Sequence, residues 1–222
     1  MTSRIVLLHA TPVAMEPIHT AFAEIWPQAE TINLLDDGLS IDRARSQELT
    51  EAMIDRFVRL GEYAADMQAD GILITCSAFG PAIDRLAEKL TIPVLRPNEA
   101  MFRQAIAQGS DIGMLATFGP AVETMTAEFD EYVARTGSTA RLTTVLVPEA
   151  IDLLKKGDAQ SHNRLVAARA AELAHCDVIM LAHFSTSRAA AAVREQVSIP
   201  VLTAPHAAAS LMKASVTDTG EE

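Results

Sequence analysis

The chain has 222 residues, of which 49% are hydrophobic and 21% charged, a composition typical of folded globular proteins and not of disordered segments. A formal net charge of -11 without any Lys/Arg-rich run excludes a nucleic-acid surface, which needs clustered positive charge, but not a small anionic ligand. No apolar stretch approaches the roughly 20 residues that span a bilayer, and the apolar run at 5–8 is too short for a signal sequence. Together with two cysteines that lack paired spacing, these features predict a cytoplasmic protein with no membrane span, disulfide or metal site.

Short apolar runs alternate with longer helical patterns along the whole chain. Strands are predicted at 5–8, 72–74, 94–95, 112–115, 144–147, 178–181 and 201–202. Helices are predicted at 14–26, 43–68, 81–90, 98–108, 120–136, 161–174, 187–197 and 205–213. Because continuous apolar strands between helices are typical of parallel sheets covered on both faces, the fold class is predicted to be α/β.

Two stretches of the chain match each other without a gap when one is moved by 107 positions. Residues 70–100 read DGILITCSAFGPAIDRLAEKLTIPVLRPNEA, and residues 177–207 read DVIMLAHFSTSRAAAAVREQVSIPVLTAPHA. Asp70 falls on Asp177 and Cys76 on His183. A self-match of this period indicates a duplicated structural unit. Residues 8–11 also resemble 114–117, at an offset of 106, which a single insertion would reconcile.

The duplication predicts two similar lobes. The first is expected to span residues 1–96 and the second residues 97–213. A polar tail at 214–222 is expected to be disordered or docked on the first lobe.

Ligands of open α/β sheets bind at the carboxyl ends of the strands, where both members of the aligned pair lie. A thiol before a helix N-terminus, as expected for Cys76, is favoured as a thiolate and can act as a base or nucleophile, or it can be a small buried hydrophobe. Imidazole titrates near neutrality, so His183 can transfer a proton or serve only as a structural hydrogen-bonder. Because two proton-active groups occupy equivalent positions, a catalytic role is favoured.

Nearby side chains at the same strand ends favour a small carboxylate or imide-like ligand, since hydroxyl groups can donate to carboxylate oxygens. The candidate substrate-binding residues are Thr11, Thr75, Ser77, Thr117, Phe118, Phe184 and Ser185. Less weight falls on His9 at the first strand end, and on Glu99 and His206, which are also 107 positions apart.

These motifs resemble the cofactor-independent aspartate/glutamate racemase superfamily, which includes hydantoin racemase, maleate isomerase and arylmalonate decarboxylase. Residues 74–81, Ile-Thr-Cys-Ser-Ala-Phe-Gly-Pro, are similar to the first catalytic cysteine motif, and 112–117 to the strand that opens the second half. The resemblance implies two flavodoxin-like lobes related by a pseudo-twofold axis, an active-site cleft between them, no cofactor, and a homodimer.

The chain departs from the family where a second catalytic cysteine is expected, because Leu181-Ala182-His183-Phe184 stands there. Cys176 precedes the strand and is expected to be structural. The leading hypothesis is a racemase in which Cys76 and His183 act as opposed proton-transfer groups at the Cα of a small carboxylate, amino acid or hydantoin.

Two alternatives remain. One is covalent cis–trans isomerisation of a maleate-like diacid with Cys76 as nucleophile. The other is a catalytically degenerate protein that binds a small acid without changing it.

Overall fold

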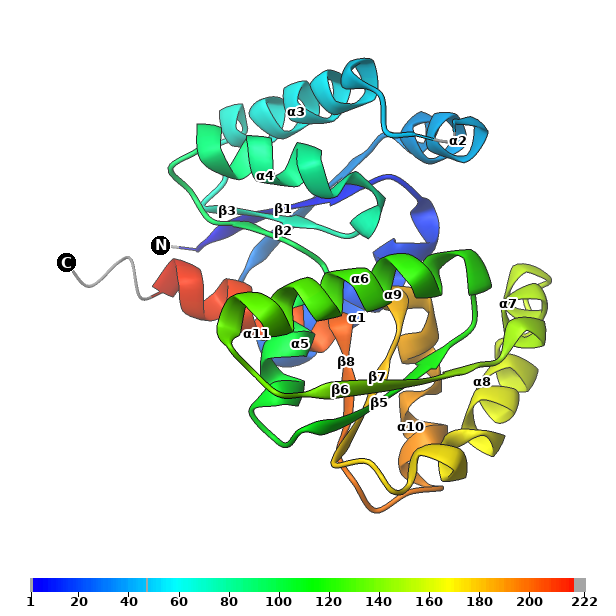
Figure 1. Cartoon of the computed structure of the whole chain (residues 1–222). Coiled ribbons are helices and arrows are strands. Elements are labelled where there is room, and N and C mark those ends of the chain that lie inside the picture. The colour runs from blue at the N-terminus through cyan, green and yellow to red at the C-terminus, as the bar shows by residue number, and fades with distance from the viewer. Residues whose placement is uncertain (1, 47, 218–222) are drawn as a thin grey trace. The chain divides into compact units, whose positions relative to one another are not determined.

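A computed structural model describes residues 2–46 and 48–217 of the chain (Figure 1). Strands and helices alternate throughout, which confirms the predicted α/β class. By their contacts, the described residues form two compact units. The first comprises residues 2–98 and 208–217, and the second comprises residues 99–207.

The first unit is built on a parallel four-stranded sheet in the order β2-β1-β3-β4. Its strands are β1 (Arg4–His9), β2 (Glu30–Leu35), β3 (Gly71–Ile74) and β4 (Val94–Leu95). Its helices are η1 (Pro12–Ala14), α1 (Met15–Ile25), α2 (Asp37–Arg45), α3 (Glu51–Asp66), η2 (Ser77–Phe79) and α4 (Gly80–Lys89). Helices α3 and α4 cover one face of the sheet and α1 lies on the other face (Figure 1). Successive residues of a strand therefore pack against helices on opposite faces of the sheet, and both faces of the sheet are apolar.

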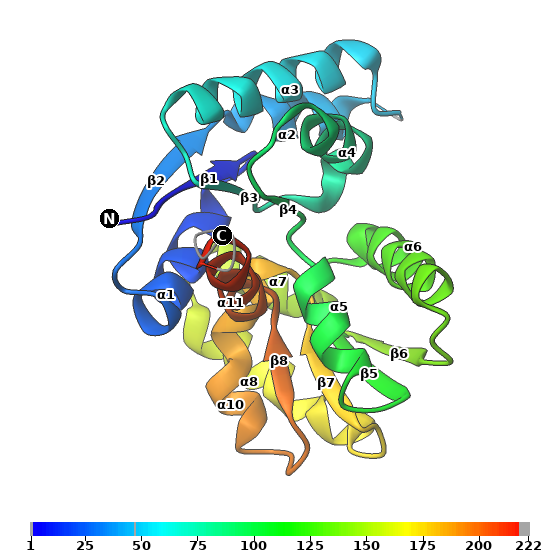
Figure 2. The same cartoon turned by 90° about the vertical axis from the view of Figure 1, so that its left-hand side faces the viewer.

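The second unit repeats this arrangement, with the sheet order β6-β5-β7-β8 and all neighbours parallel. Its strands are β5 (Asp111–Ala116), β6 (Arg141–Leu146), β7 (Val178–Leu181) and β8 (Val201–Thr203). Its helices are α5 (Glu99–Ile106), α6 (Gly119–Thr136), α7 (Pro148–Lys155), α8 (Ala159–Ala168), η3 (Ala170–Leu173), α9 (His183–Thr186), η4 (Ser187–Ala189) and α10 (Ala190–Arg194). Figure 2 shows α8 and α10 on one face of this sheet, and α5 and α6 on the other. The last helix, α11 (Ala204–Thr217), begins in the second unit and ends in the first.

The register among β1, β3 and β4 of the first sheet is repeated among β5, β7 and β8 of the second at a shift of 107. Ile5 pairs with Gly71 in the first sheet, and Ile112 with Val178 in the second, so both partners are shifted by 107. The expected offset of 106 at the first strands is therefore wrong. The offset of 106 aligned Thr11 with Thr117. With the shift of 107 given by the strand pairing, the residue that corresponds to Thr11 is Phe118.

The aligned aspartates have the same structural role in both units. The Arg4 N–H donates to Oδ2 of Asp70 at 2.7 Å, and the Asp111 N–H donates to Oδ2 of Asp177 at 2.8 Å. Each carboxylate thus caps the amino end of the neighbouring strand, β1 or β5. The sequence match therefore reflects a repeated contact as well as a repeated fold.

Three local expectations differ from the structure. The helix expected at 43–68 is two helices, because the chain leaves the helix after Arg45 and Thr50 begins α3 by accepting the Met53 N–H at 3.3 Å. The strand β2 was not expected, since its residues are partly exposed and mixed in character. Helix α11 continues to Thr217, so residues 214–217 of the expected polar tail are helical, and residues 218–222 lie outside the described residues.

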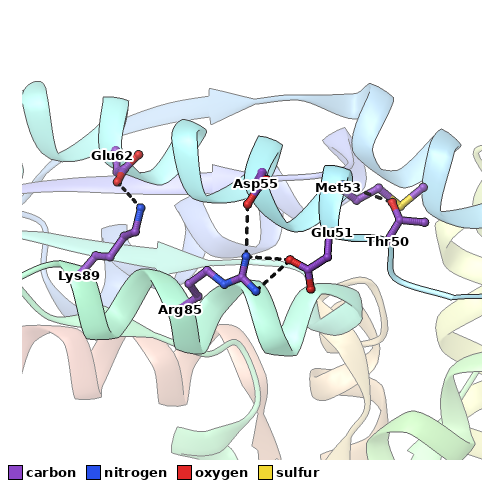
Figure 3. A network of polar contacts seen from close by, with 7 residues as sticks. All are labelled: Thr50, Glu51, Met53, Asp55, Glu62, Arg85 and Lys89. Carbon is purple, nitrogen blue, oxygen red and sulfur yellow. Dashed lines mark hydrogen bonds and ion pairs between the residues drawn. The ribbon is translucent and has the colours of Figure 1, made fainter.

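Helices α3 and α4 are joined on their exposed side by ion pairs (Figure 3). Arg85 binds Glu51 at 3.0 Å and Asp55 at 3.2 Å, and Lys89 binds Glu62 at 2.8 Å. Solvent-exposed pairs contribute little to stability, so the apolar contacts beneath them, made by residues such as Phe57 and Leu86, hold the helices together.

Within residues 2–46 and 48–217, no helix has the length and apolar character needed to cross a membrane. In the same part of the chain, no three His, Cys, Asp or Glu side chains are grouped to hold a metal ion.

Candidate active site

Cys76 lies at the carboxyl end of β3, in extended backbone with φ -133° and ψ 120°. Its side chain is half-buried against the apolar cluster formed by the sheet with α3 and α4. The three-residue turn η2 separates it from α4, and Phe79 of that turn stacks on Phe57 with ring centroids 5.1 Å apart. The segment after the thiol is therefore anchored in the core.

His183 lies at the equivalent end of β7, but its backbone is left-handed, with φ 64°. A residue other than glycine rarely adopts this conformation, and such residues concentrate at functional sites. The Nε2 atom of His183 is buried and has no hydrogen-bond partner among the described residues. Burial lowers the pKa of His183 to about 4, so its imidazole is neutral at pH 7.

The two positions are equivalent by hydrogen bonding as well as by sequence. The Thr75 N–H donates to the Leu8 carbonyl at 3.1 Å, and the Ala182 N–H donates to the Leu115 carbonyl at 2.9 Å. Each bond ties the residue immediately before Cys76 or His183 to the neighbouring strand. The last fixed backbone contact before each candidate catalytic residue is therefore duplicated.

Two of the predicted substrate-binding hydroxyls have protein partners. The Thr75 hydroxyl lies 2.8 Å from Nδ1 of His9, and the Thr117 hydroxyl lies 3.2 Å from that of Thr186. Thr75 and Thr117 are almost fully buried. These contacts give both threonines a structural role within their own unit, and a role in substrate binding stays a prediction.

The other predicted binding residues differ in exposure. Thr11, Ser77 and Ser185 are half-buried, and Phe184 is buried. Phe118 is 43% exposed, and the Lys155 ammonium lies 6.0 Å from its ring centroid. Thr11, Ser77, Phe118 and Ser185 thus keep surface that a ligand could contact.

Two buried histidines were given little or no weight from the sequence, His9 at a strand end and His162 on a helix. His9 is fully buried between Thr75 and Asn33, and Asn33 lies on the unexpected strand β2. In the second unit, His162 on α8 is fully buried, and its pKa is lowered by burial and then by the charge of Arg188. Polar residues inside helical or strand patterns give no signal of burial, so only His9, at a strand end, was detectable.

Cys176 lies at the opposite end of β7 from His183, as expected. It is buried in the core of the second unit, where burial raises the pKa of its thiol. Asp111 and Asp177 act in the same direction. A buried thiol with a raised pKa is a poor nucleophile, so Cys76 is the better candidate for chemistry.

Comparison with known proteins identifies the family. Residues 8–145 match the model of the family described as Asp/Glu/Hydantoin racemase, which is more than half of the chain. No curated protein sequence matches the chain.

Solved structures of racemases share the fold over nearly the whole chain. The glutamate racemase from Thermus thermophilus has 16% identity and a TM-score of 0.69, with 99% of this chain and 82% of that one covered. The aspartate racemase from Picrophilus torridus has 13% identity and a TM-score of 0.73, with coverage of 98% and 95%. The allantoin racemase from Klebsiella pneumoniae has 16% identity and a TM-score of 0.72, with coverage of 98% and 89%.

At these identities the solved structures establish a common fold, and the family model adds the assignment. The chain belongs to the Asp/Glu/Hydantoin racemase family and is an isomerase of the racemase type.

Proposed function

We propose that the protein is a cofactor-independent racemase acting at the Cα of a small carboxylate, amino acid or hydantoin, with Cys76 and His183 as opposed proton-transfer groups. The observation that carries the proposal is the register: each residue follows the duplicated backbone bond to Leu8 or Leu115, in equivalent strands. The names of the structural relatives, which are glutamate, aspartate and allantoin racemases, support this substrate class.

The neutral state of His183 supports a part as the base in one direction of the proposed cycle. Because the pKa of His183 is lowered to about 4, its neutral imidazole enters the reaction as a base and accepts the Cα proton. The electron pair left on Cα delocalises onto the adjacent carbonyl as an enolate. Cys76 then donates the thiol proton to the opposite face of Cα, and the product has the inverted configuration.

The reverse direction uses the same two groups with their roles exchanged. The Cys76 thiolate removes a proton, and the His183 imidazolium returns one. An imidazolium with a pKa near 4 gives up its proton readily, so His183 is a strong acid once charged. Because enantiomers interconvert with an equilibrium constant of one, kcat/KM must be equal in both directions at every pH. We therefore expect the two directions to differ in the pH dependence of kcat alone, and equal kcat profiles would contradict a mixed thiol–imidazole pair.

The test is exchange of the Cα proton in deuterated water, followed by NMR, with glutamate, aspartate and hydantoins as substrates. Cys76→Ser should lower the exchange rate by about 10²- to 10⁴-fold, the range of a lost general acid–base group. His183→Asn is the matched variant, because asparagine tolerates the left-handed backbone at φ 64° and so preserves the turn. It should cause a comparable loss.

The outcome also separates the alternatives. Conversion of maleate that is lost in Cys76→Ser but retained in His183→Asn would support covalent cis–trans isomerisation. Measurable binding of these acids with no exchange or conversion of any of them would support a binding protein and overturn the racemase proposal.

The family resemblance also leads us to propose a homodimer in the cytoplasm. Sedimentation analysis measures the first property and cell fractionation the second.

A further inference from the structure

A chain of polar side chains leads from the buried end of β3, through the exposed Asn33 on β2, to helix α1. Nδ1 of His9 lies 2.8 Å from the hydroxyl of Thr75, the residue directly before Cys76. Nε2 of His9 lies 3.0 Å from Oδ1 of Asn33, which also lies 2.8 Å from Nε2 of His19. The fully buried His9 thus connects the thiol-bearing strand end to β2 and α1.

The donors and acceptors in this chain fix the tautomer of His9. A carboxamide oxygen only accepts hydrogen bonds, so Nε2 of His9 carries the proton that is donated to Asn33. In a neutral ring Nδ1 is then an acceptor. The Thr75 hydroxyl lies 2.8 Å from Nδ1 and 3.3 Å from the Leu8 carbonyl, so the shorter contact favours donation to Nδ1. The neutral form is favoured, because burial, the largest effect, lowers the pKa of His9. The hydrogen bond to Asn33 raises it by less, and the nearby His19 lowers it.

The second unit lacks this bond at the equivalent position. Residues 107 positions beyond His9 and Thr75 are Ala116 and Ala182, so both members of the pair are alanine. The backbone bonds are otherwise the same, at 3.1 Å from Thr75 to Leu8 and 2.9 Å from Ala182 to Leu115. The side-chain contacts of the Thr75 hydroxyl, with Nδ1 of His9 at 2.8 Å and with the Leu8 carbonyl at 3.3 Å, have no counterpart at Ala182.

The backbone of the next residue differs as well. After the His9–Thr75 bond the chain stays extended at Cys76, with φ -133°, whereas after the alanine pair it turns left-handed at His183, with φ 64°. Thr75 directly precedes Cys76 in the chain, so a bond that fixes Thr75 also constrains the backbone that carries the thiol.

We propose that His9 is a positioning residue: its hydrogen bond to the Thr75 hydroxyl holds the end of β3 so that Cys76 is presented in extended backbone. The catalytic meaning of this role rests on the proposed function, because it assumes that the Cys76 thiol transfers the proton. The positioning itself can be measured without a substrate.

The test compares variants of His9 and Thr75 in a Cys176→Ala background, which leaves the thiol of Cys76 as the one to be alkylated. Asparagine places a polar atom near Nδ1 of histidine and glutamine places one near Nε2, so His9→Asn keeps the bond to Thr75 and His9→Gln loses it. In the same way, Thr75→Ser keeps the hydroxyl and Thr75→Val removes it at constant shape. The readout is the rate of Cys76 alkylation by iodoacetamide, with the free energy of unfolding measured in parallel.

We expect His9→Gln and Thr75→Val each to change the alkylation rate by about threefold or more, the lower range of coupling between contacting residues. The double variant should change it no further, and His9→Asn and Thr75→Ser should stay near the parent rate. His175→Ala, which removes an exposed histidine outside the network, serves as a control.

Equal alkylation rates in His9→Asn and His9→Gln, or an unchanged rate in Thr75→Val, would overturn the positioning role even if stability falls. If the rates separate as expected but no variant or parent catalyses Cα exchange, the proposed function fails and the positioning of Cys76 stands. With an active parent, His9→Gln should lower kcat more than it changes KM, because the proton donor is displaced and substrate contacts are not.

Discussion

His183 combines two costly features at one residue, a left-handed backbone and a buried imidazole nitrogen without a described partner. Each costs on the order of 1–3 kcal/mol, and neither is required by the fold, since Cys76 occupies the equivalent position in ordinary extended backbone. Conformational strain that the repeat does not need is best explained by function. The sequence could reveal that a histidine aligns with the thiol, but not that the backbone turns there, because no glycine or asparagine marks the turn.

The low pKa of His183 makes stability depend on pH in a defined window. An unfolded histidine titrates near 6.5 and the folded imidazole near 4, so between these values the unfolded state binds more protons. The free energy of unfolding should therefore be fully retained above pH 6.5 and fall as the pH drops toward 4. His9 and His162, whose pKa values are also lowered mainly by burial, act with the same sign.

We expect urea unfolding at pH 7 and pH 4.5 to show a smaller loss of stability in His183→Asn than in the wild type, because the variant has one fewer group to protonate. NMR of the imidazole protons should place one histidine near pH 4. An identical pH dependence in the two proteins would show that His183 is not buried in its neutral form.

At the scale of elements, Gly61 of α3 lets helix α4 approach closely. A Cβ built there would lie 2.6 Å from Cδ1 and 3.0 Å from Cγ of Leu86, which is fully buried on α4. A glycine inside a helix costs about 1 kcal/mol relative to alanine, and here it lets the two helices pack closely. The contact lies beneath the ion pairs of Arg85 and Lys89.

Gly61→Val should lower the free energy of unfolding by about 1–3 kcal/mol, because the added side chain overpacks the interface with Leu86. The matched control is Arg59→Val on the exposed side of the same helix, which should cost about 0.5 kcal/mol through helix propensity alone. Chemical denaturation measures both, and equal losses would mean that α4 shifts to accommodate the new side chain.

The elements also show what the sequence could and could not predict. The strands β1, β3, β5 and β7 are buried except at the first residues of β1 and β5, Arg4 and Asp111. Their buried parts contain continuous apolar runs, and all four strands were predicted. The strand β2 was missed because its polar and apolar residues are mixed without regular alternation and none of them is fully buried. The break between α2 and α3 was missed because Ser46 and Thr50 lie inside an otherwise helical pattern, and Thr50 shows itself as a cap only through its bond to Met53.

For the whole molecule, the duplication extends from sequence to hydrogen bonds. The carboxylates of Asp70 and Asp177 accept equivalent N–H groups, with Asp177 also accepting the Ser110 N–H at 2.8 Å. These N–H groups lower the pKa of Asp177, so its contribution to stability is present at neutral pH and is lost as the pH falls below the ordinary aspartate range.

We expect Asp70→Ala and Asp177→Ala each to lower the melting temperature at pH 7, with the larger loss for Asp177, which accepts the additional bond from Ser110. Because the two aspartates lie in different units and share no partner, the double variant should lose the sum of the single effects. An unchanged melting temperature in Asp70→Ala would indicate that Asp70 has a role other than its contact with Arg4.

The family and the two-unit fold could be inferred from the chain because each rests on periodic or repeated residues. The arrangement of the site could not, because the bonds of His9, Thr75 and Asn33 join residues 66 and 24 positions apart. No local pattern encodes a contact of this kind.

The passage of α11 from the second unit into the first has a consequence for synthesis. Met212 of this helix packs against Gly71 of β3, in space that a side chain at position 71 would fill. Lys213 Nζ donates to the Ile25 carbonyl at 3.2 Å. Domains usually fold in the order in which they leave the ribosome. Here the second unit is continuous in the chain, whereas the first must wait for residues 208–217, so the unit translated first is the last to be completed.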